Sequence, residues 1–300
     1  MLFEMSVIAS FPIELRDWIE HNLTRGIEPQ AIVHELVERK TAPELAVTMV
    51  NAVSSAILHG IPLPGPTIEV GSSPIAYEPE PLRVPDSAMI LLGDRRVQVI
   101  ARLRRPVALL MDNFLDVEEC TALIELAKPR LQHSTIVDPV TGSNIVAGHR
   151  SSDGMFFQLG ETPLIERIEA RIAALTGLPI ENGEGLQLLH YEIGAESTPH
   201  VDYLMTRNRA NSESIERSGQ RVGTLLMYLN DVEAGGETVF PQIGWSVTPR
   251  RGQALYFEYG NSLGYCDPSS LHAGNPVRAG HKWLATKWIR SRRFIPRNAS

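Results

Sequence analysis

A histidine and an aspartate two residues apart form a pair that could hold a metal ion. They are His200 and Asp202, in the segment TPHVDYLM (198–205), which is typical of a β-strand. Residues i and i+2 of a strand face the same side, so the imidazole and the carboxylate would project together. One more histidine from a neighbouring strand would complete a two-histidine, one-carboxylate triad, which binds Fe(II) and leaves coordination positions open.

Two histidines further along the chain are candidates for the third ligand. His272 stands in DPSSLHAGNPV, near a turn, and His281 begins the strand-like segment HKWLATKWIR (281–290). If that segment alternates as a strand, His281 faces away from the side that carries Lys282. The residues alone leave the choice between the two histidines open.

Lys282 would share one strand face with Leu284, Thr286 and Trp288, so its side chain should be buried. A buried lysine needs an anionic partner, and an organic carboxylate inside the fold would supply one. The plainer alternative is a lysine that reaches solvent or pairs with a carboxylate of the protein. Only four of the 28 basic residues are lysines, and a lysine suits a narrow site that needs a compact point charge.

Four segments between about residues 96 and 291 carry a resemblance to a known family. They are EGLQLLHYEIG (184–194), PHVDY (199–203), GQRVGTLLMYLNDVEAGGETVFP (219–241) and SLHAGNPVRAGHKWLATKWI (270–289). Together they resemble the prolyl 4-hydroxylase group of 2-oxoglutarate- and Fe(II)-dependent dioxygenases. In that family a His-x-Asp pair is followed by a distal histidine and, ten residues later, by a lysine. The resemblance therefore implies His200, Asp202 and His272 as metal ligands, and Lys282 as the residue that holds 2-oxoglutarate.

The same resemblance implies the remaining site residues and the cofactors. The implied partners of the distal 2-oxoglutarate carboxylate are Tyr191 and Thr224, and the implied substrate residues are Arg150, Ser152, Glu184 and Trp288. Arg150 could equally form a surface ion pair, and Trp288 could equally belong to the core. The implied cofactors are Fe(II), 2-oxoglutarate and O2, with ascorbate as a reductant and with succinate and CO2 as products. The run GGET (235–238) matches the family too, although a turn between strands is a sufficient explanation for it.

Two departures from the family pattern affect the choice of substrate. Members that act on peptidyl proline usually carry glutamine and tyrosine where this chain has Ala195 and Ser197. The first hypothesis is therefore a hydroxylase of prolyl residues in a peptide or protein. The second is the same chemistry on a free amino acid or another small molecule, and the third is a non-catalytic β-domain that binds a metal or a ligand.

The surrounding elements predict a mainly β (α+β) fold, a double-stranded β-helix or jelly roll with flanking helices. Short runs rich in β-branched and aromatic residues alternate with turn residues. The expected strands are 96–103, 107–114, 186–193, 198–205, 221–230, 236–241, 245–249, 253–259 and 281–290. Helical spacing of apolar residues predicts helices at 116–128, with Asp116 as N-cap, and at 161–177, ended by Gly177. The polar stretch 206–220 is expected to be an exposed, mobile loop and a candidate lid.

The chain is expected to have three parts. Residues 1–60 form a small helical unit of unknown role, with helices at 11–23, 27–40 and 42–58. Residues 61–86 hold seven of the 21 prolines, which predicts a semi-rigid linker. Residues 87–300 form the dioxygenase domain.

Composition limits the classes of partner. The net charge of −7 gives no indication of nucleic-acid binding, and no stretch of about 18 apolar residues predicts a membrane span. Two cysteines far apart, together with an N-terminus that makes a poor signal peptide, predict a cytoplasmic protein. The expected partners are a peptide, protein or small-molecule substrate, and a second copy of the chain through residues 1–60.

Overall fold

The computed structural model of the chain contains two compact units, each with its own hydrophobic core. The described residues are 7–27, 29–59, 61–70, 80, 83–133, 135–137, 144–146, 152–205, 209–261 and 266–296. The first unit comprises Met1–Glu78 with Met205–Asn211, and the second comprises Pro79–Leu204 with Ser212–Ser300.

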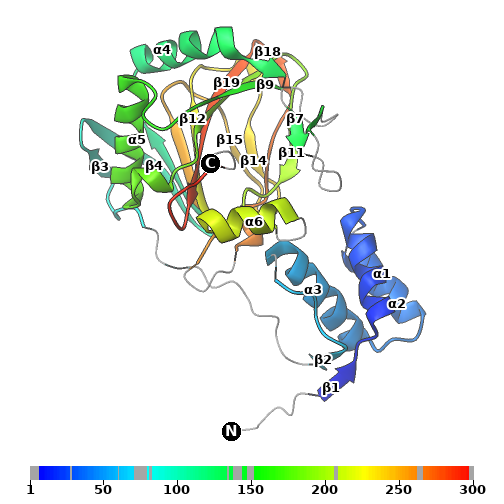
Figure 1. Cartoon of the computed structure of the whole chain (residues 1–300). Helices are drawn as coiled ribbons and strands as arrows, with labels where there is room; N and C mark the ends of the chain where they lie inside the picture. The colour runs from blue at the N-terminus through cyan, green and yellow to red at the C-terminus, as the bar shows by residue number, and fades with distance from the viewer. Residues whose placement is uncertain are drawn as a thin grey trace. The chain divides into compact units, whose positions relative to one another are not determined.

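The first unit packs three helices and a two-stranded sheet around one core (Figure 1). Its elements are β1 (Val7–Ser10), α1 (Ile13–Thr24), α2 (Pro29–Glu38), α3 (Pro43–His59) and β2 (Thr67–Val70). The helices lie close to the ranges expected from the sequence. Apolar residues spaced by four, such as Ile32 and Leu36 on α2 and Met49 and Val53 on α3, are buried together in this core.

The strand β2 lies inside the segment 61–86 that was expected to be a linker. It pairs antiparallel with β1, from Val7↔Val70 to Ser10↔Thr67, and neither strand is predicted by the sequence pattern. Proline next to a short edge strand removes no hydrogen bond from a central ladder, so the proline count alone does not exclude a strand here. Ile68 belongs to the core of the first unit, and its burial gives this short run a partner surface.

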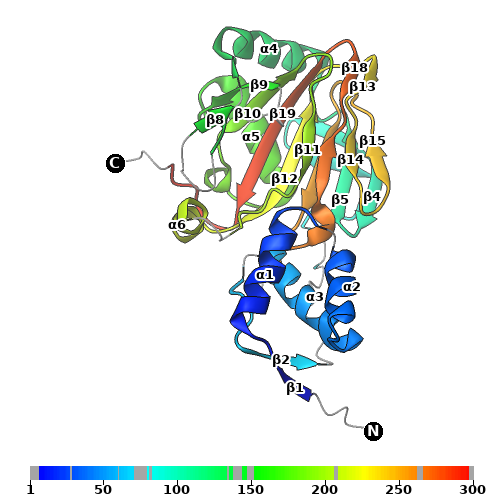
Figure 2. The same ribbon diagram turned by 90° about the vertical axis from the view of Figure 1, so that its right-hand side faces the viewer.

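The second unit is built mostly of antiparallel sheets, which confirms the predicted predominance of β-structure (Figures 1 and 2). A nine-stranded sheet has the order β3-β4-β5-β16-β12-β19-β10-β9-β6, and a four-stranded sheet has the order β11-β17-β14-β15. The strands of the large sheet are β3 (Met89–Leu92), β4 (Arg95–Arg104), β5 (Val107–Asp112), β6 (Gln132–His133), β9 (Ser152–Phe157), β10 (Leu186–Tyr191), β12 (Arg221–Tyr228), β16 (Ala254–Glu258) and β19 (Lys282–Arg290). Those of the smaller sheet are β11 (Ser197–His200), β14 (Thr238–Phe240), β15 (Trp245–Val247) and β17 (His272–Gly274).

Smaller elements complete this part of the chain. Two further pairs of strands are β7 (Thr135–Val137) with β8 (Asn144–Val146), and β13 (Ala234–Gly235) with β18 (Val277–Ala279). The helices are α4 (Val117–Ala127), α5 (Pro163–Thr176), α6 (Arg209–Ser218) and the short 3-10 turns η1 (Lys128–Arg130), η2 (Ile180–Asn182) and η3 (Pro268–Ser270). Among the described residues, no helix is both long enough and apolar enough to span a membrane.

The strand β19 has two buried faces with different roles. Trp283, Ala285 and Ile289 belong to the core that also contains residues of α4 and α5. The alternate residues Lys282, Leu284, Thr286 and Trp288 line a cleft on the other face. The predicted alternation and the predicted burial of Lys282 are therefore both confirmed.

The predicted ends of α4 and α5 are confirmed. Asp116 caps α4 by accepting a hydrogen bond from the Glu119 backbone, and the Glu119 carboxylate accepts one from the Asp116 backbone in return. The helix α5 ends at Gly177, whose φ of 68° is easily adopted only by glycine.

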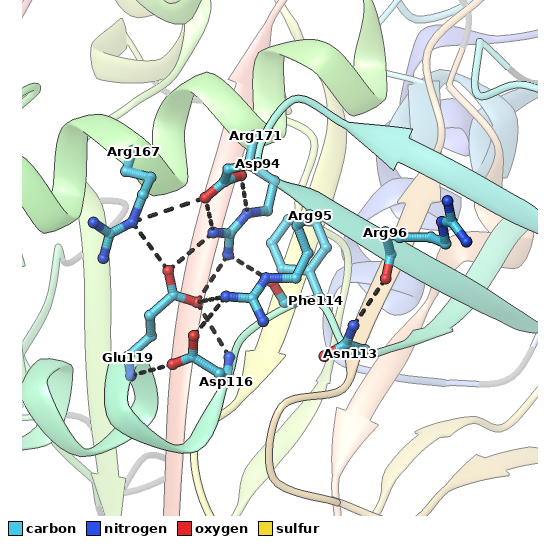
Figure 3. A network of polar contacts seen from close by, with 9 residues as sticks. All are labelled: Asp94, Arg95, Arg96, Asn113, Phe114, Asp116, Glu119, Arg167 and Arg171. Atoms are coloured by element: carbon cyan, nitrogen blue, oxygen red, sulfur yellow. Dashed lines mark hydrogen bonds and ion pairs between the residues drawn. The ribbon is translucent and has the colours of Figure 1, made fainter.

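An ion-pair network joins these two helices to the turn between β3 and β4 (Figure 3). Arg171 of α5 is fully buried and contacts Asp94 at 2.7 Å and Glu119 at 2.9 Å. Glu119 also contacts Arg95 and Arg167, at 3.3 and 3.2 Å. Since the Arg171 guanidinium lies among carboxylates that it bonds directly, its charge is matched within the protein.

Two segments near the site differ from the sequence prediction. The stretch 206–220, expected to be a loop, contains α6, because Arg290 and Arg292 of the C-terminal segment donate to the carbonyls of Gly219 and Ile215 at the end of that helix. The predicted strand 198–205 also stops early, because β11 ends at His200 and the chain then bends. Asp202 therefore lies on a bend and not on the strand.

Candidate active site

The ligand atoms of His200, Asp202 and His272 lie within 4.8 Å of one another, a geometry that could hold a metal ion. Strand pairing brings the histidines together, because β11 and β17 are antiparallel neighbours in which His200 lies opposite His272. The bend after β11 then returns Asp202 between them. Its two carboxylate oxygens lie 3.6 Å from His200 Nε2 and 3.6 Å from His272 Nε2.

Backbone carbonyls fix the orientation of both imidazoles. His200 Nδ1 lies 2.8 Å from the Thr198 carbonyl, and His272 Nδ1 lies 2.9 Å from the Ser270 carbonyl. A proton on each Nδ1 donates to these carbonyls and leaves each Nε2 lone pair facing the cluster. The loop before His272 is held in turn by Asp267, which caps η3 by accepting from the Ser269 backbone.

The Asp202 carboxylate is buried and remains ionised. Burial by itself would raise its pKa, but His272, His200 and Arg221 together with the Thr224 hydroxyl lower the pKa to about 2. Thr224 Oγ1 donates to Asp202 Oδ2 at 2.7 Å and lies 3.0 Å from Tyr259 Oη. Two imidazoles and an ionised carboxylate form the donor set that Fe(II) binds in a two-histidine, one-carboxylate site.

Lys282 is buried, and no carboxylate of the described residues forms an ion pair with it. Its side chain is 3% exposed, and its Nζ donates to the Gly236 carbonyl at 2.7 Å. Within the described part of the chain it forms no ion pair with a carboxylate. Burial lowers the pKa of Lys282 to about 8, and Glu237 offsets only part of this effect.

Lys282 and the histidine cluster open into one cleft. The cleft encloses about 440 Å³, including space open to solvent. Its lining includes Gln187, Tyr191, Ser197, His200, Asp202, Thr238, His272, Lys282 and Trp288. The cleft therefore brings a buried cationic group and a candidate metal site together, an arrangement suited to an anion that also contacts a metal ion.

Tyr191 and Thr224 differ in how they relate to Lys282. The Tyr191 ring is 5.4 Å from Lys282 Nζ, and Tyr191 lines the cleft as expected. Thr224 is not part of the lining, because its hydroxyl is bonded to Asp202. Thr224 therefore orients the carboxylate of Asp202, one of the candidate metal ligands, and does not lie beside Lys282.

Thr238 is the hydroxyl residue that the sequence analysis missed. It lines the cleft, and its Oγ1 accepts a hydrogen bond from Tyr228 at 2.9 Å. It stands in GGET (235–238), a run for which a turn between strands is a sufficient explanation from the sequence. The glycines of this run could have indicated its role. Gly236 has a φ of 71°, which disfavours other residues, and its carbonyl accepts the hydrogen bond from Lys282.

The expected substrate residues fall in different places. Trp288 lines the cleft and lies 4.0 Å below the Arg221 guanidinium, whereas Glu184 is outside the lining and binds Arg221 through both carboxylate oxygens, at 2.7 and 2.9 Å. Ser152 is fully buried on β9, opposite Tyr191 of β10. Arg150 lies outside the described residues.

Arg221 was not singled out from the sequence, although it connects several of these residues. Its Nη1 donates to the Asp202 carbonyl at 3.1 Å while its guanidinium covers Trp288. His281, the other candidate for a ligand, lies away from the cluster, 5.6 Å from the His190 ring. It is not one of the cleft-lining residues.

Comparison with known proteins agrees with this geometry. Residues 186–290 match the model of the 2OG-Fe(II) oxygenase superfamily. The chain is 43% identical over 217 residues to probable prolyl 4-hydroxylase 10 of Arabidopsis thaliana, covering 66% of this chain and 73% of that one. It is 42% identical over 221 residues to prolyl 4-hydroxylase 5 of the same plant, covering 67% of this chain and 74% of that one.

A solved structure is also similar. It is the viral collagen prolyl hydroxylase of Paramecium bursaria Chlorella virus-1 in complex with 2-oxoglutarate, with 27% identity and a TM-score of 0.49. The match covers 61% of this chain and 94% of that chain.

The site and the superfamily match define an Fe(II)- and 2-oxoglutarate-dependent dioxygenase, which uses O2 as its second substrate. Within that class, the chain belongs to the prolyl 4-hydroxylase family.

Proposed function

We propose that the protein hydroxylates proline residues in a peptide or protein, with release of succinate and CO2. The observation that carries the chemistry is a buried lysine, Lys282, in the same cleft as the His200, Asp202 and His272 cluster and without an ion pair to any carboxylate of the described residues. The relatives named as prolyl 4-hydroxylases, at more than 40% identity, support proline as the target residue.

His200, Asp202 and His272 would hold Fe(II), and Lys282 would bind the distal carboxylate of 2-oxoglutarate. Tyr191, whose ring is 5.4 Å from Lys282 Nζ, and Thr238, which lines the same cleft, would complete this carboxylate site. When bound, the metal and 2-oxoglutarate supply the oxidising power by activating O2, with decarboxylation of the oxo acid. The residues of this chain provide position and charge for that chemistry.

Three actions of the protein follow from the described contacts. The Thr198 and Ser270 carbonyls hold the histidine Nε2 atoms toward the metal position. Thr224 and Arg221 hold Asp202 from its carboxylate and its backbone. The wall formed by Trp288, under Arg221, limits where a substrate C–H bond can lie.

A second candidate is hydroxylation of a free amino acid or another small molecule. It is favoured by Ser197, a small residue in the cleft lining where relatives acting on peptidyl proline usually carry tyrosine. A smaller side chain leaves that part of the lining without an aromatic contact for a prolyl ring.

We propose a jelly-roll core for residues 87–300, since the nine-stranded and four-stranded antiparallel sheets both contribute residues to the cleft.

The small helical unit at residues 1–60 is proposed to mediate dimerisation. Light scattering of the full chain would test this, and a monomer at micromolar concentration would contradict it.

The substrate is tested by incubating the protein with Fe(II), 2-oxoglutarate and O2. Proline-containing peptides are compared with free L-proline and other free amino acids, and both succinate and a gain of one oxygen atom are measured by mass spectrometry. We expect the oxygen on a prolyl residue of a peptide. Oxygen on free amino acids alone would favour the second candidate, and succinate at background with every compound would contradict both.

A further inference from the structure

A second histidine pair lies on the face of the large sheet that is opposite to the cleft. His190 precedes Tyr191 on β10, and His281 directly precedes Lys282, the first residue of β19. Because neighbouring residues of a strand point to opposite faces, both imidazoles face away from the cleft that Tyr191 and Lys282 line. They line a separate groove beside α4, which encloses about 1030 Å³ including space open to solvent.

Strand pairing and one asparagine fix the positions of the two imidazoles. His190 lies opposite Trp283 of β19, and their rings are stacked with centres 4.3 Å apart. His281 comes two residues before Trp283, which makes it a diagonal neighbour of His190 on the same face. Asn230 holds the chain there, because its side chain donates to the His281 carbonyl at 2.8 Å and accepts from the Trp283 backbone at 2.7 Å. The pair is therefore in place before any ligand binds, which lowers the entropic cost of binding.

The separation of the two imidazoles suits one shared metal ion. Their ring centres are 5.6 Å apart, and two imidazoles on one tetrahedral Zn(II) ion, with Zn–N bonds of about 2.0–2.1 Å, have centres roughly 5 Å apart. A third donor is near, because Glu192 Oε1 lies 3.7 Å from His190 Nδ1. The corresponding nitrogen–oxygen separations in the His200, Asp202 and His272 cluster are 3.6 Å.

The donor atoms of this group are available to a metal ion. Within the described residues, neither imidazole forms a hydrogen bond. Burial lowers the pKa of His190, so its ring is neutral at pH 7 and keeps a lone pair for coordination. The Glu192 side chain is 74% exposed, so it can rotate to bring its carboxylate onto an ion that the two imidazoles hold. Lys128, which also lines the groove, pairs with Glu125 at 2.6 Å, and this pairing reduces its repulsion of a cation.

We propose that His190, His281 and Glu192 bind a divalent transition-metal ion, Zn(II), at a second site outside the catalytic cleft. Zn(II) takes imidazole and carboxylate donors, and water supplies its fourth position. Mn(II) and Fe(II) bind a given set of such donors most weakly in the first-row series, so this site favours Zn(II) over them. The inference goes beyond the proposed function and does not depend on it.

The bound ion cross-links the two strands that carry the lysine end of the cleft. Tyr191 lies opposite Lys282 in the sheet register, and the two proposed histidine ligands are the residues directly before this pair. An ion shared by His190 and His281 therefore ties the end of β10 to the start of β19. Since the unfolded chain does not hold the two imidazoles together, binding of the ion also stabilises the folded chain.

The test counts the Zn(II) ions that the untagged full chain binds. Protein is dialysed against a buffered free Zn(II) concentration, and bound zinc is measured by elemental mass spectrometry. His281→Gln removes an exposed ligand of the outer site, and His200→Ala with His272→Ala removes the catalytic cluster. His34→Gln is the matched control, because His34 Nδ1 lies 3.6 Å from Glu38 but forms no ring contact with another histidine of the described residues.

We expect two zinc ions in the wild-type chain and in His34→Gln, one in His281→Gln, one in the cluster double variant and none when all three substitutions are combined. In calorimetry on the double variant, adding His281→Gln should weaken Zn(II) binding at least about tenfold, since loss of even an outer partner of a ligand costs that much. Zn(II) should raise the melting temperature of the double variant and not that of the combined variant.

Cu(II) bound to the cluster double variant gives a second, spectroscopic readout. Its electron paramagnetic resonance spectrum should show coupling to two imidazole nitrogens, and His281→Gln should reduce this to one. His190→Gln should do the same from the other strand, and circular dichroism checks that the chain still folds without the ring stacked on Trp283. A zinc count that His281→Gln leaves unchanged, or a single ion in the wild-type chain, would overturn the inference whatever substrate the enzyme hydroxylates.

Discussion

Two lysines of the same strand are both buried, and the protein treats their charges in opposite ways. Lys287 of β19 lies opposite Leu225 of β12, and its Nζ contacts Glu169 of α5 at 2.6 Å. Lys282 is five residues earlier on β19 and faces the cleft, where its Nζ donates to the Gly236 carbonyl and forms no ion pair with a carboxylate of the described residues. An odd separation puts the two side chains on opposite faces of the sheet.

The difference distinguishes a buried lysine that serves the fold from a buried lysine that serves ligand binding. A buried charge that already has its counter-charge, such as Lys287 with Glu169, contributes to the fold and needs no ligand. A buried charge without a counter-charge among the described residues, such as Lys282, lowers the stability of the ligand-free protein, and binding of an anion removes that cost. The face of the sheet that carries α5 and the face that carries the cleft can therefore be tested with matched substitutions on one strand.

The largest effect is expected on the cleft side, at the metal ligands. His272→Ala should reduce succinate formation at least about 100-fold, because loss of even an outer partner of a metal ligand costs up to that much. Binding of Mn(II), followed by electron paramagnetic resonance, should weaken in parallel. His281→Ala is the matched control, since His281 lies outside the cleft lining. Equal loss in the two variants would show that the cluster is not the metal site.

The next effect is expected on the helix side. Lys287→Met should lower the free energy of unfolding by about 3–5 kcal/mol, because Glu169 would remain buried without its partner. Urea unfolding followed by circular dichroism measures this change. The KM for 2-oxoglutarate of the folded fraction should stay at its wild-type value, and an increase in KM with unchanged stability would reverse the roles assigned to the two lysines.

Lys282→Met is the matched change on the cleft side, with the opposite pattern. The KM for 2-oxoglutarate should rise about 10–100-fold, since a charge-assisted hydrogen bond to the ligand carboxylate is lost. The unfolding free energy without ligand should stay level or increase at pH 7, because the uncompensated buried charge is removed. Isothermal titration calorimetry and urea unfolding on the same sample measure the two quantities. A destabilised variant with unchanged KM would place Lys282 among the structural lysines.

Much of this contrast was accessible from the sequence. The alternation of residues 281–290 predicted that Lys282 is buried beside Leu284, and the helical spacing around Asp116 predicted α4 with its cap. Local patterns of this kind depend on a residue's own neighbours, so they survive in the fold. The predicted position of Asp202 beside the histidines is correct, but the predicted reason is wrong. The strand β11 ends at His200, and a bend, not strand alternation, returns the carboxylate to the histidines.

Long-range partners were the part that the sequence could not provide. Thr224 was expected at 2-oxoglutarate but is bonded to Asp202, while Thr238 reaches the cleft from another sheet. The choice between these threonines depends on pairing with strands distant in the sequence, because Thr224 lies opposite Trp288 of β19 and Thr238 opposite Gly274 of β17, and no local pattern encodes such pairs. The helix α6 was missed for a similar reason, because its last turn is bonded by Arg290 and Arg292 from the far end of the chain.

The smallest predicted effect is a pH dependence that belongs to Lys282 alone. Its pKa of about 8 without ligand means that the ammonium form predominates at pH 7 and is about one-tenth populated at pH 9. The KM for 2-oxoglutarate should therefore be flat below about pH 7 and rise about tenfold by pH 9, because only the ammonium form binds the carboxylate. Lys282→Arg should flatten this rise, since a guanidinium stays charged.

The stability of the ligand-free protein should increase with pH over a range that overlaps the one in which 2-oxoglutarate binding weakens. Because the pKa of Lys282 is lower in the folded protein than its usual 10.5, the unfolded chain binds the proton more tightly between about pH 8 and 10.5. The contribution of Lys282 to the unfolding free energy therefore increases as the pH rises through this window. The difference between wild-type and Lys282→Met protein isolates that contribution, and a difference that does not vary with pH would contradict the uncompensated charge on which the comparison of the two lysines depends.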